Sequence, residues 1–296
     1  MEPARQPSPD LSSGPSSERR RRPMHFLWSL ALSALSVYAL LLALLWFAQE
    51  KLIFLPSKLP ADHRFDFGTD VHEVWIERPS AAGSDATKLH ALHLRLPAPD
   101  GLVFYLHGNA GNLDGWFADP GFWRSVNHDL FMLDYRGYGK SAGRVTSEAQ
   151  LIDDVRAAWQ QVAPAYRGKR LVIFGRSLGS ALAARLAAEV GPDLTVLVSP
   201  YESMAALAAE HYRWVPAALL RYPLRTDEAV AQLRGRLLLL HGEHDEVIGA
   251  HHSERLLARA SRAADARLVR VPRAGHNDLQ LFDVYLDGLR EALARR

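Results

Sequence analysis

The chain has 296 residues, 48% of them apolar, which is long enough for one large domain with a sizeable buried core. Its net charge is only +2, and the arginines of residues 1–24 supply that excess, so the remainder is balanced and offers no basic face for nucleic acid. The absence of cysteine excludes disulfides, thiolate metal sites and a cysteine nucleophile.

The N-terminal segment has the pattern of a basic tail followed by a membrane anchor. Residues 1–24 are rich in proline and serine and contain four consecutive arginines, so we expect a disordered basic tail. Residues 26–47 carry no charge, are long enough as a helix to cross a hydrocarbon core of about 30 Å, and exceed the apolar length of a cleaved signal peptide. We therefore expect a transmembrane helix over residues 25–48, with the N-terminus cytoplasmic and the rest of the chain extracytoplasmic.

Residues 49–70 are expected to form a juxtamembrane linker, and from residue 71 onward short apolar runs alternate with amphipathic segments. Runs such as LVIF and LLLL are typical of strands in a parallel sheet covered on both faces. The predicted strands are 71–77, 89–96, 102–106, 130–134, 171–174, 194–198, 236–240 and 268–271, and the predicted helices are 147–162, 178–190, 252–260 and 279–293. The first two strands are expected to be antiparallel and the others mostly parallel, which predicts an α/β fold over residues 71–296.

Residues 200–233 interrupt this alternation. They lie between two predicted strands and hold several aromatic residues and prolines, namely Tyr201, Tyr212, Trp214, Tyr222, Pro216 and Pro223. We interpret the segment as a small helical cap over the carboxyl edge of the sheet, where ligands bind in open α/β sheets.

A candidate nucleophile lies at the turn between a predicted strand and a predicted helix. The sequence Gly175-Arg176-Ser177-Leu178-Gly179 directly follows the strand LVIF and precedes the helix SALAARLAAEV. A tight strand-to-helix turn needs small flanking residues, here Gly175 and Gly179, and exposes the Ser177 hydroxyl above the sheet. The motif alone is a weak signal. Its place between a strand and a helix makes it specific for a reactive serine.

A reactive serine needs a base to take its proton and an acid to orient that base. Asp245 follows the strand RLLLL and His276 follows the strand RLVRV, so both are expected at the same sheet edge as Ser177. The chain order serine, acid, histidine is the one used by hydrolases with this strand–serine–helix turn. Glu243 and Glu246 are the alternatives to Asp245.

The oxyanion of an acyl-transfer intermediate requires two preorganised N–H donors. We expect one from the backbone of Leu178 and the other from Asn109, in the loop that begins with His107 and Gly108 after the strand LVFYL. This glycine-rich loop lacks the Gly-Lys-Ser/Thr ending of a phosphate-binding loop, so no nucleotide site is expected.

Polar residues also follow the next strand. Asp134 and Arg136 are expected to brace the loop at residues 107–112 by hydrogen bonds, with contact to substrate as the alternative.

His241, His244, His251 and His252 lie near Asp245 in the sequence. A metal site is conceivable there, but metal ligands need defined geometry from several elements. We interpret the histidines as exposed residues of a polar loop and expect no metal site.

Taken together, these motifs resemble the α/β-hydrolase superfamily, and more narrowly its membrane-anchored branch of bud-emergence-46 and alpha/beta-hydrolase-domain-13 proteins. The matching segments are HGNAGN at 107–112, DYRGYGKS at 134–141, FGRSLGS at 174–180, HGEHDEVI at 241–248, GHND at 275–278, and LIFLPS after the anchor. The resemblance implies an α/β-hydrolase fold with an eight-stranded sheet, helices on both faces and no cofactor. It also implies Ser177 as nucleophile, Asp245 as acid and His276 as base.

The expected activity is hydrolysis of an acyl ester or thioester. The anchor at residues 26–47 and the aromatic cap favour a lipid, a lysolipid or an acylated protein as substrate. A serine aminopeptidase on the same fold is the alternative, with Glu202 or Glu210 holding the substrate amine. A non-catalytic membrane-bound binding module is a third reading, although no triad member is missing. No pattern in the sequence indicates an oligomeric state.

Overall fold

A computed structural model describes residues 18–79 and 86–295, and the chain divides into two compact units, Met1–Phe47 and Ala48–Arg296. The tail expected at residues 1–24 lies outside the described residues as far as residue 17. Each unit is described by itself.

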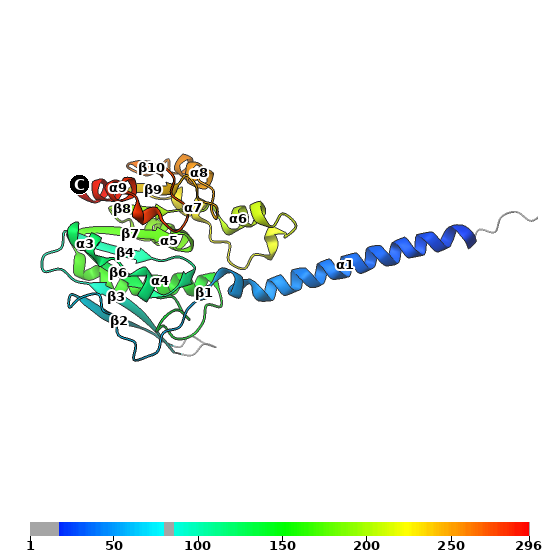
Figure 1. The fold of residues 1–296 in the computed structure, drawn as a ribbon, viewed down its shortest axis with the longest axis horizontal. Helices are drawn as coiled ribbons and strands as arrows, with labels where there is room; N and C mark the ends of the chain where they lie inside the picture. Colours follow the sequence, from blue (N-terminus) through cyan, green and yellow to red (C-terminus); the bar gives the residue numbers. More distant parts are fainter. Residues whose placement is uncertain (1–17, 80–85, 296) are drawn as a thin grey trace, which may run out of the picture. The chain divides into compact units, whose positions relative to one another are not determined.

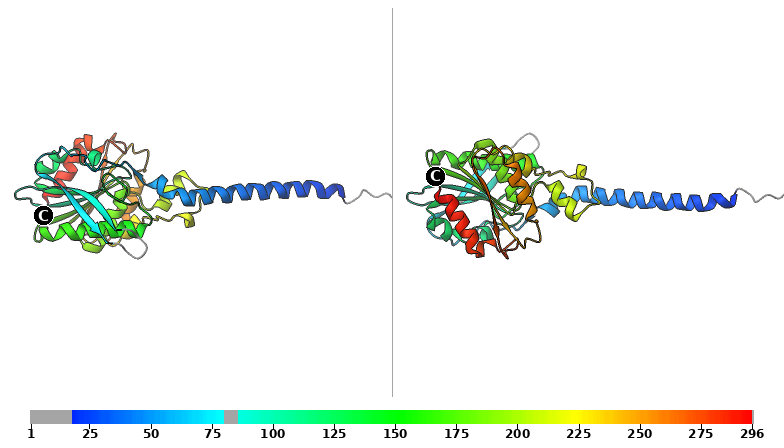
Figure 2. Two further views of the ribbon diagram at one scale, coloured as in Figure 1. Left: turned by 90° about the horizontal axis from the view of Figure 1, so that it is seen from below. Right: turned by 90° about the horizontal axis from the view of Figure 1, so that it is seen from above.

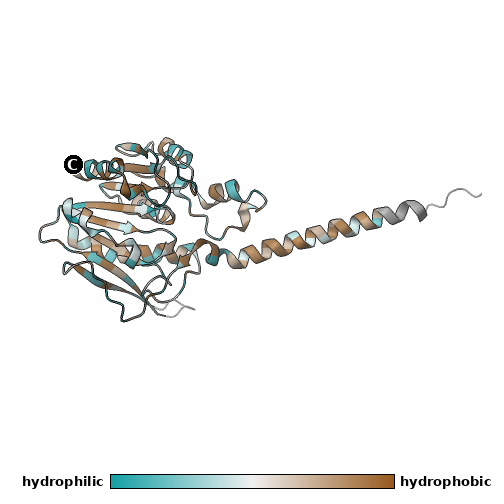
Figure 3. Cartoon of the chain, in the orientation of Figure 1, coloured by the Kyte–Doolittle hydropathy of each residue, from teal (hydrophilic) through white to brown (hydrophobic). Residues whose placement is uncertain are grey.

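The first helix, α1, spans Glu18–Ile53 and contains the expected anchor. Its segment Met24–Ile53 is 30 residues long, and by length and composition it is able to cross a membrane. At 1.5 Å per residue it extends about 45 Å, more than a hydrocarbon core of about 30 Å. Figure 3 shows hydrophobic residues along most of the coloured part of this helix.

Helix α1 extends beyond the expected anchor at both ends. It begins at Glu18, within the range expected for the tail, and ends at Ile53, within the range expected for the linker. Glutamate, arginine, alanine, glutamine and lysine all have high helix propensity, so residues on either side continue the helix that the apolar run has nucleated.

The second unit is built on an eight-stranded sheet with the order β10-β9-β8-β7-β4-β6-β3-β2 (Figure 1). β3 is antiparallel to both β2 and β6, and the other neighbouring strands are parallel. All eight predicted strands are confirmed, with ends shifted by a few residues. They are β2 (Val71–Arg78), β3 (Thr87–Leu94), β4 (Gly101–Leu106), β6 (His128–Leu133), β7 (Arg170–Arg176), β8 (Leu194–Val198), β9 (Arg236–Gly242) and β10 (Ala266–Val271).

Helices cover both faces of the sheet, as expected for strands that are apolar on both sides. α4 (Glu148–Val162), α5 (Leu178–Val190) and α8 (His251–Arg259) contribute to one apolar cluster, while α3 (Pro120–Ser125) and α9 (Asp283–Ala294) contribute to the other. Figure 2 shows α4 (green) and α9 (red) on opposite sides of the sheet.

The helix predicted over residues 279–293 is interrupted. The structure has a 3₁₀ turn, η3 (Leu279–Leu281), then Phe282 with extended backbone, and only then α9. Phe282 packs against the apolar cluster on this face, and that packing overrides the local helical pattern. The sequence analysis also missed α2 (Leu113–Trp116) and α3, which are too short to show a helical period.

The segment of residues 200–233 contains α6 (Met204–His211), a 3₁₀ turn η2 (Ala217–Leu219) and α7 (Thr226–Val230). α7 buries Ala229 and Val230 in the main apolar cluster, so it belongs to the core. α6 buries none of its residues. The predicted helical cap over residues 200–233 is therefore limited to α6 and η2.

The segment after α1 forms a second, two-stranded sheet. β1 (Leu55–Pro56) pairs in parallel with β5 (Ala110–Gly111), which lies in the loop that follows β4. The preceding side chain of Phe54 is buried against Tyr222, with ring centroids 5.1 Å apart.

Candidate active site

Ser177 lies at the turn between β7 and α5, as the sequence predicts. Its backbone has φ 52° and ψ −121°, a conformation that a residue with a side chain rarely adopts. Its N–H donates to the carbonyl oxygen of Val198 at 2.9 Å, which fixes the turn to the neighbouring strand β8. Strain of this kind persists only where the surrounding structure imposes it.

The two glycines of the motif are required by close backbone contact. A methyl group on Gly175 would lie 2.4 Å from the carbonyl oxygen of Gly179, and one on Gly179 would lie 2.1 Å from the carbonyl oxygen of Leu106. Both distances are far inside van der Waals contact, so any side chain would force α5 away from β4 and β7.

The structure brings Ser177, His276 and Asp245 into one hydrogen-bonded chain. His276 Nε2 is 3.0 Å from Ser177 Oγ, and His276 Nδ1 is 2.8 Å from Asp245 Oδ2. A carboxylate only accepts, so Nδ1 carries the proton and Nε2 accepts from the Ser177 hydroxyl. This is the tautomer that a general base needs. Glu243 and Glu246, the alternatives to Asp245, are exposed.

The carboxylate of Asp245 is fully buried and hydrogen-bonded on both oxygens. Oδ1 accepts from the N–H groups of Val247 and Ile248, at 3.0 and 2.8 Å. Burial alone would raise the pKa of Asp245, but the hydrogen bonds from His241, His276 and the Ile248 backbone outweigh it and hold the pKa well below its usual value. Asp245 therefore stays ionised at neutral pH.

His241 supports Asp245, a role that the sequence analysis missed. Its Nε2 lies 3.4 Å from Asp245 Oδ2 and 2.7 Å from the carbonyl oxygen of Ile248. Its Nδ1 lies 2.6 Å from Ser253 Oγ. The position of His241 at the end of the same strand, four residues before the acid, was the available signal.

The loop at residues 107–112 lies beside Ser177. A methyl group on Gly108 would lie 3.7 Å from the Cβ atom of Ser177. The neighbouring Asn109 has its carbonyl oxygen held by two donors, the Leu55 N–H at 2.8 Å and the Tyr138 hydroxyl at 2.6 Å. Leu178 is the first residue of α5, so its N–H has no acceptor within the helix. Both proposed oxyanion donors therefore belong to segments adjoining the Ser177 side chain.

The β1 segment braces this loop, which the sequence analysis did not foresee. Besides the Leu55 bond, Ser57 N–H donates to the carbonyl oxygen of Gly111 at 3.0 Å. The carbonyl oxygen of Ser57 accepts from the Gly139 N–H and from Asn112 Nδ2, at 2.9 and 3.1 Å. The chain that follows α1 thus holds the backbone of the loop that carries Asn109.

Asp134 lies beside the loop at residues 107–112 and bonds to the residue that follows it, whereas Arg136 pairs elsewhere. The buried Asp134 lies 3.5 Å from His107 Nε2 and accepts from the Leu113 N–H at 3.5 Å. The prediction for Arg136 is wrong, because its guanidinium pairs with both oxygens of Asp154 on α4, at 2.5 and 3.0 Å. A buried carboxylate that accepts two hydrogen bonds binds an arginine more strongly than the carbonyl oxygens of a loop do.

Arg176 was only the variable position of the serine motif in the sequence analysis. Its Nη2 donates to the carbonyl oxygen of His276 at 2.9 Å, and its Nη1 donates to Gln280 at 3.1 Å. Arg176 thereby ties the residue before the nucleophile to the loop that carries the base.

The interpretation of the four histidines near Asp245 as exposed loop residues is wrong for His241 and His252, which are fully buried because each packs inside the fold against a polar partner. His241 is buried beneath Asp245, and His244 is exposed. His251 and His252 instead face Glu210 on α6, and within the described residues these three form a cluster with metal-ligand spacing.

The comparisons with known proteins agree with this fold. Residues 97–226 match the family model described as serine aminopeptidase, S33. The chain is 33% identical over 278 residues to an uncharacterized protein of Mycobacterium tuberculosis strain CDC 1551, which covers 89% of this chain and 95% of that protein. It is 30% identical over 207 residues to alpha/beta hydrolase domain-containing protein 17B of Xenopus laevis, covering 67% and 68%.

Solved structures show the same fold. An esterase from Pyrococcus furiosus superposes with a TM-score of 0.63 at 19% identity, covering 81% of this chain and 96% of that one. Alpha/beta hydrolase domain-containing protein 10 from mouse superposes with a TM-score of 0.56 at 18% identity, covering 75% and 96%. The fold is that of an α/β hydrolase. The chain belongs to the α/β-hydrolase superfamily, which confirms the resemblance of its motifs to that superfamily.

Proposed function

We propose that this protein is a serine hydrolase that cleaves an acyl ester or thioester of a lipid, a lysolipid or an acylated protein at a membrane surface. The observation that carries the proposal is the continuous hydrogen-bonded chain from Asp245 through His276 to Ser177. An arrangement with both links below 3.2 Å is what proton transfer from a serine requires.

The reaction follows from the roles of these groups. Ser177 Oγ attacks the acyl carbonyl carbon while His276 Nε2 takes the hydroxyl proton, and Asp245 stabilises the resulting imidazolium. The N–H groups of Leu178 and Asn109 bind the oxyanion. When the tetrahedral intermediate collapses, His276 gives its proton to the departing alcohol or thiol, and a water molecule then releases the acid by the same steps.

Two features support a substrate with an acyl chain and a polar leaving group. A polar pocket of about 310 Å³ lies beside His276, lined also by His244, Arg273 and Asn277. The unit also exposes Leu52, Leu55 and Trp214, apolar side chains suited to a lipid surface.

The test is covalent labelling of the purified full chain in detergent by a fluorophosphonate probe. Ser177→Ala should abolish labelling and ester hydrolysis. Ser125→Ala is the matched control, because this exposed serine bonds only to its own helix in the described contacts. Equal labelling of the Ser177→Ala variant and the wild type would refute the assignment of Ser177 as nucleophile.

A serine aminopeptidase is the second candidate, because the matching family model bears that description. The carboxylates expected to hold a substrate amine are already engaged. Glu202 pairs with Arg255 at 3.0 Å, and Glu210 contacts His251 at 2.7 Å. We therefore expect fatty-acyl reporters to be cleaved faster than aminoacyl amides, and the reverse order would favour the peptidase.

We further propose that α1 anchors the protein with its N-terminus in the cytoplasm and the hydrolase domain on the other side. The support is the apolar segment Met24–Ile53 together with the arginines that precede it. Protease added to intact cells or spheroplasts should digest the C-terminal unit. Its protection until the membrane is permeabilised would refute the orientation.

A further inference from the structure

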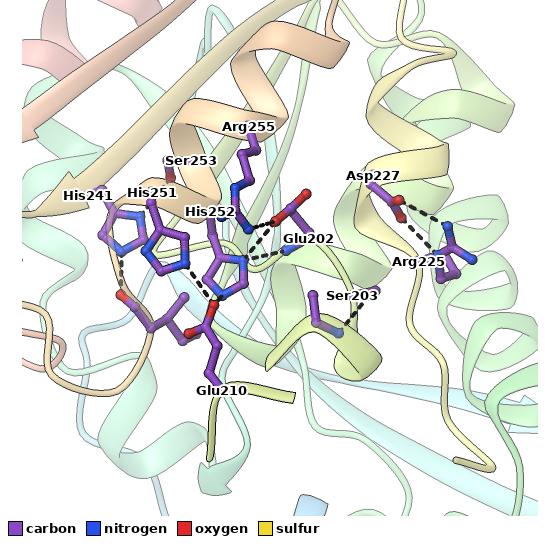
Figure 4. A network of polar contacts seen from close by, with 12 residues as sticks. Glu202, Ser203, Glu210, Arg225, Asp227, His241, His251, His252, Ser253 and Arg255 are labelled. Atoms are coloured by element: carbon purple, nitrogen blue, oxygen red, sulfur yellow. Dashed lines mark hydrogen bonds and ion pairs between the residues drawn. The ribbon is translucent and has the colours of Figure 1, made fainter. Parts of the chain in front are cut away.

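Two helices of the second unit bring a carboxylate and two imidazoles together away from Ser177. Glu210 lies on α6, and His251 and His252 are the first two residues of α8. Their ligand atoms all lie within 4.8 Å of one another. Figure 4 shows the three side chains converging, with Glu202 and Arg255 next to them.

The contacts within this cluster leave one buried nitrogen poorly satisfied. Glu210 Oε1 is 2.7 Å from His251 Nε2 and 3.2 Å from His252 Nε2. The second approach lacks hydrogen-bond geometry, so the Nε2 atom of the fully buried His252 has no hydrogen-bond partner. A buried polar atom without a partner destabilises the fold, and a ligand aimed at that atom removes this cost.

We propose that Glu210, His251 and His252 form a binding site for one divalent transition-metal ion, with Zn²⁺ as the ion that the donor set fits best. Imidazole nitrogen and carboxylate oxygen are usual zinc ligands, with bonds of about 2.0–2.2 Å. Tetrahedral ligands at that bond length lie about 3.3 Å apart. The pairs at 2.7 and 3.2 Å need only small side-chain movements to reach that spacing.

A second carboxylate lies where a zinc-bound histidine needs one. Glu202 Oε2 is 3.4 Å from His252 Nδ1, which accepts a hydrogen bond from the Glu202 backbone N–H at 3.4 Å. Zinc on Nε2 selects the tautomer with a proton on Nδ1, so on metal binding Nδ1 exchanges its bond from the Glu202 N–H for a bond to the Glu202 carboxylate. Carboxylates of this kind orient zinc-bound histidines in many proteins.

The site is also accessible and shaped for the His251 ring. The side chains of His251 and Glu210 are 41% and 34% exposed, so an ion can enter and water can complete its coordination. A methyl group on Gly249 would lie 2.5 Å from the His251 ring. Glycine at this position therefore lets the ring lie over Glu210. A bound ion joins α6 to α8, the helix that follows the loop carrying Asp245.

The test is Zn²⁺ binding to the purified full chain in detergent, without a polyhistidine tag, measured by competition with a chromophoric chelator. We expect one Zn²⁺ per chain and a rise in Tm of about 5 °C at 100-fold excess over Kd. Glu202→Gln should weaken binding about 10-fold, and Glu210→Gln and His251→Gln by at least about 100-fold. Mg²⁺, which prefers oxygen ligands, should not compete.

Two further variants separate this site from general binding by histidines. Gly249→Ala keeps every ligand but displaces the His251 ring, so it should also weaken binding. His63→Gln is the control. It removes another histidine–carboxylate pair, in which His63 Nε2 lies 3.0 Å from Asp114 Oδ1, and should leave zinc binding unchanged. The His251 side chain is only half-buried, so its variant should fold. Wild-type affinity in His251→Gln or an equal loss in His63→Gln would overturn the proposal. Absence of stoichiometric binding to the wild type would do the same.

Discussion

Removing the hydroxyl of Tyr138 tests whether the hydrogen bonds to the Asn109 carbonyl oxygen position the candidate oxyanion loop. Tyr138 is fully buried, and its hydroxyl donates to the carbonyl oxygen of Asn109 at 2.6 Å. Tyr138→Phe removes this bond and leaves the ring packing intact. The Asn109 carbonyl keeps its second donor, the Leu55 N–H at 2.8 Å, so the loop is loosened and not released.

The expected magnitudes follow from these contacts. Loss of one neutral hydrogen bond lowers the free energy of unfolding by about 1 kcal/mol, which is about 2–4 °C in Tm for a domain of this size. Complete loss of one oxyanion donor lowers kcat by about 10²–10³-fold. Because Tyr138→Phe leaves one of the two donors to the Asn109 carbonyl oxygen in place, we expect kcat to fall about 10-fold. KM should change little, because the oxyanion forms only after attack.

The assay is ester hydrolysis with kcat and KM measured separately, alongside thermal unfolding. Tyr166→Phe is the matched control, because its buried hydroxyl donates to Asp129 at 2.5 Å, far along the chain from the loop. That charged bond is worth about 2 kcal/mol, so Tyr166→Phe should lose more stability and keep its kcat. If Tyr138→Phe retains wild-type kcat while losing the expected stability, the hydroxyl does not position Asn109.

Three further predictions concern the serine turn and the acid. Gly179→Ala should lower the free energy of unfolding by about 3 kcal/mol, measured as a lower Tm, because its methyl group meets the Leu106 carbonyl oxygen at 2.1 Å. Gly115→Ala is the control and should be neutral or stabilising, because the space around Gly115 is open. Equal effects of the two substitutions would contradict the packing argument. Asp245→Asn should lower kcat by about 10⁴-fold because His276 loses the partner that fixes its tautomer. The depressed pKa of Asp245 means that its carboxylate stabilises the fold above the unfolded pKa of about 3.9 and loses this effect as the pH falls, so the stability difference between wild type and Asp245→Asn should shrink below about pH 4. A difference independent of pH down to about 2 would refute that linkage.

Local patterns predicted most of the architecture. The eight strands and the helices α4, α5 and α8 were identified from apolar runs and helical spacing, because these elements bury continuous apolar surface. The nucleophile turn was identified because its glycines and its place between strand and helix are local properties. The helices α2 and α3 were missed, although Asn112 and Asp119 cap them and Pro120 begins the second. Caps were the signal that could have found them.

Contacts between residues far apart in the chain were beyond the sequence. The pairing of Arg136 with Asp154, the bond from Arg176 to the His276 loop, and the pairing of β1 with β5 each depend on how separate elements pack. A charged side chain has several possible partners in any sequence, and only the folded chain selects one of them.

The sequence by itself determined the class of fold, the apolar N-terminal helix and the positions of the candidate serine, acid and histidine, because strand ends and tight turns leave a local signature. Only the tertiary structure decided which histidine supports Asp245, that the segment after α1 braces the Asn109 loop, and that Glu210 faces His251 and His252. Those outcomes depend on distances across the fold, which no spacing along the chain encodes.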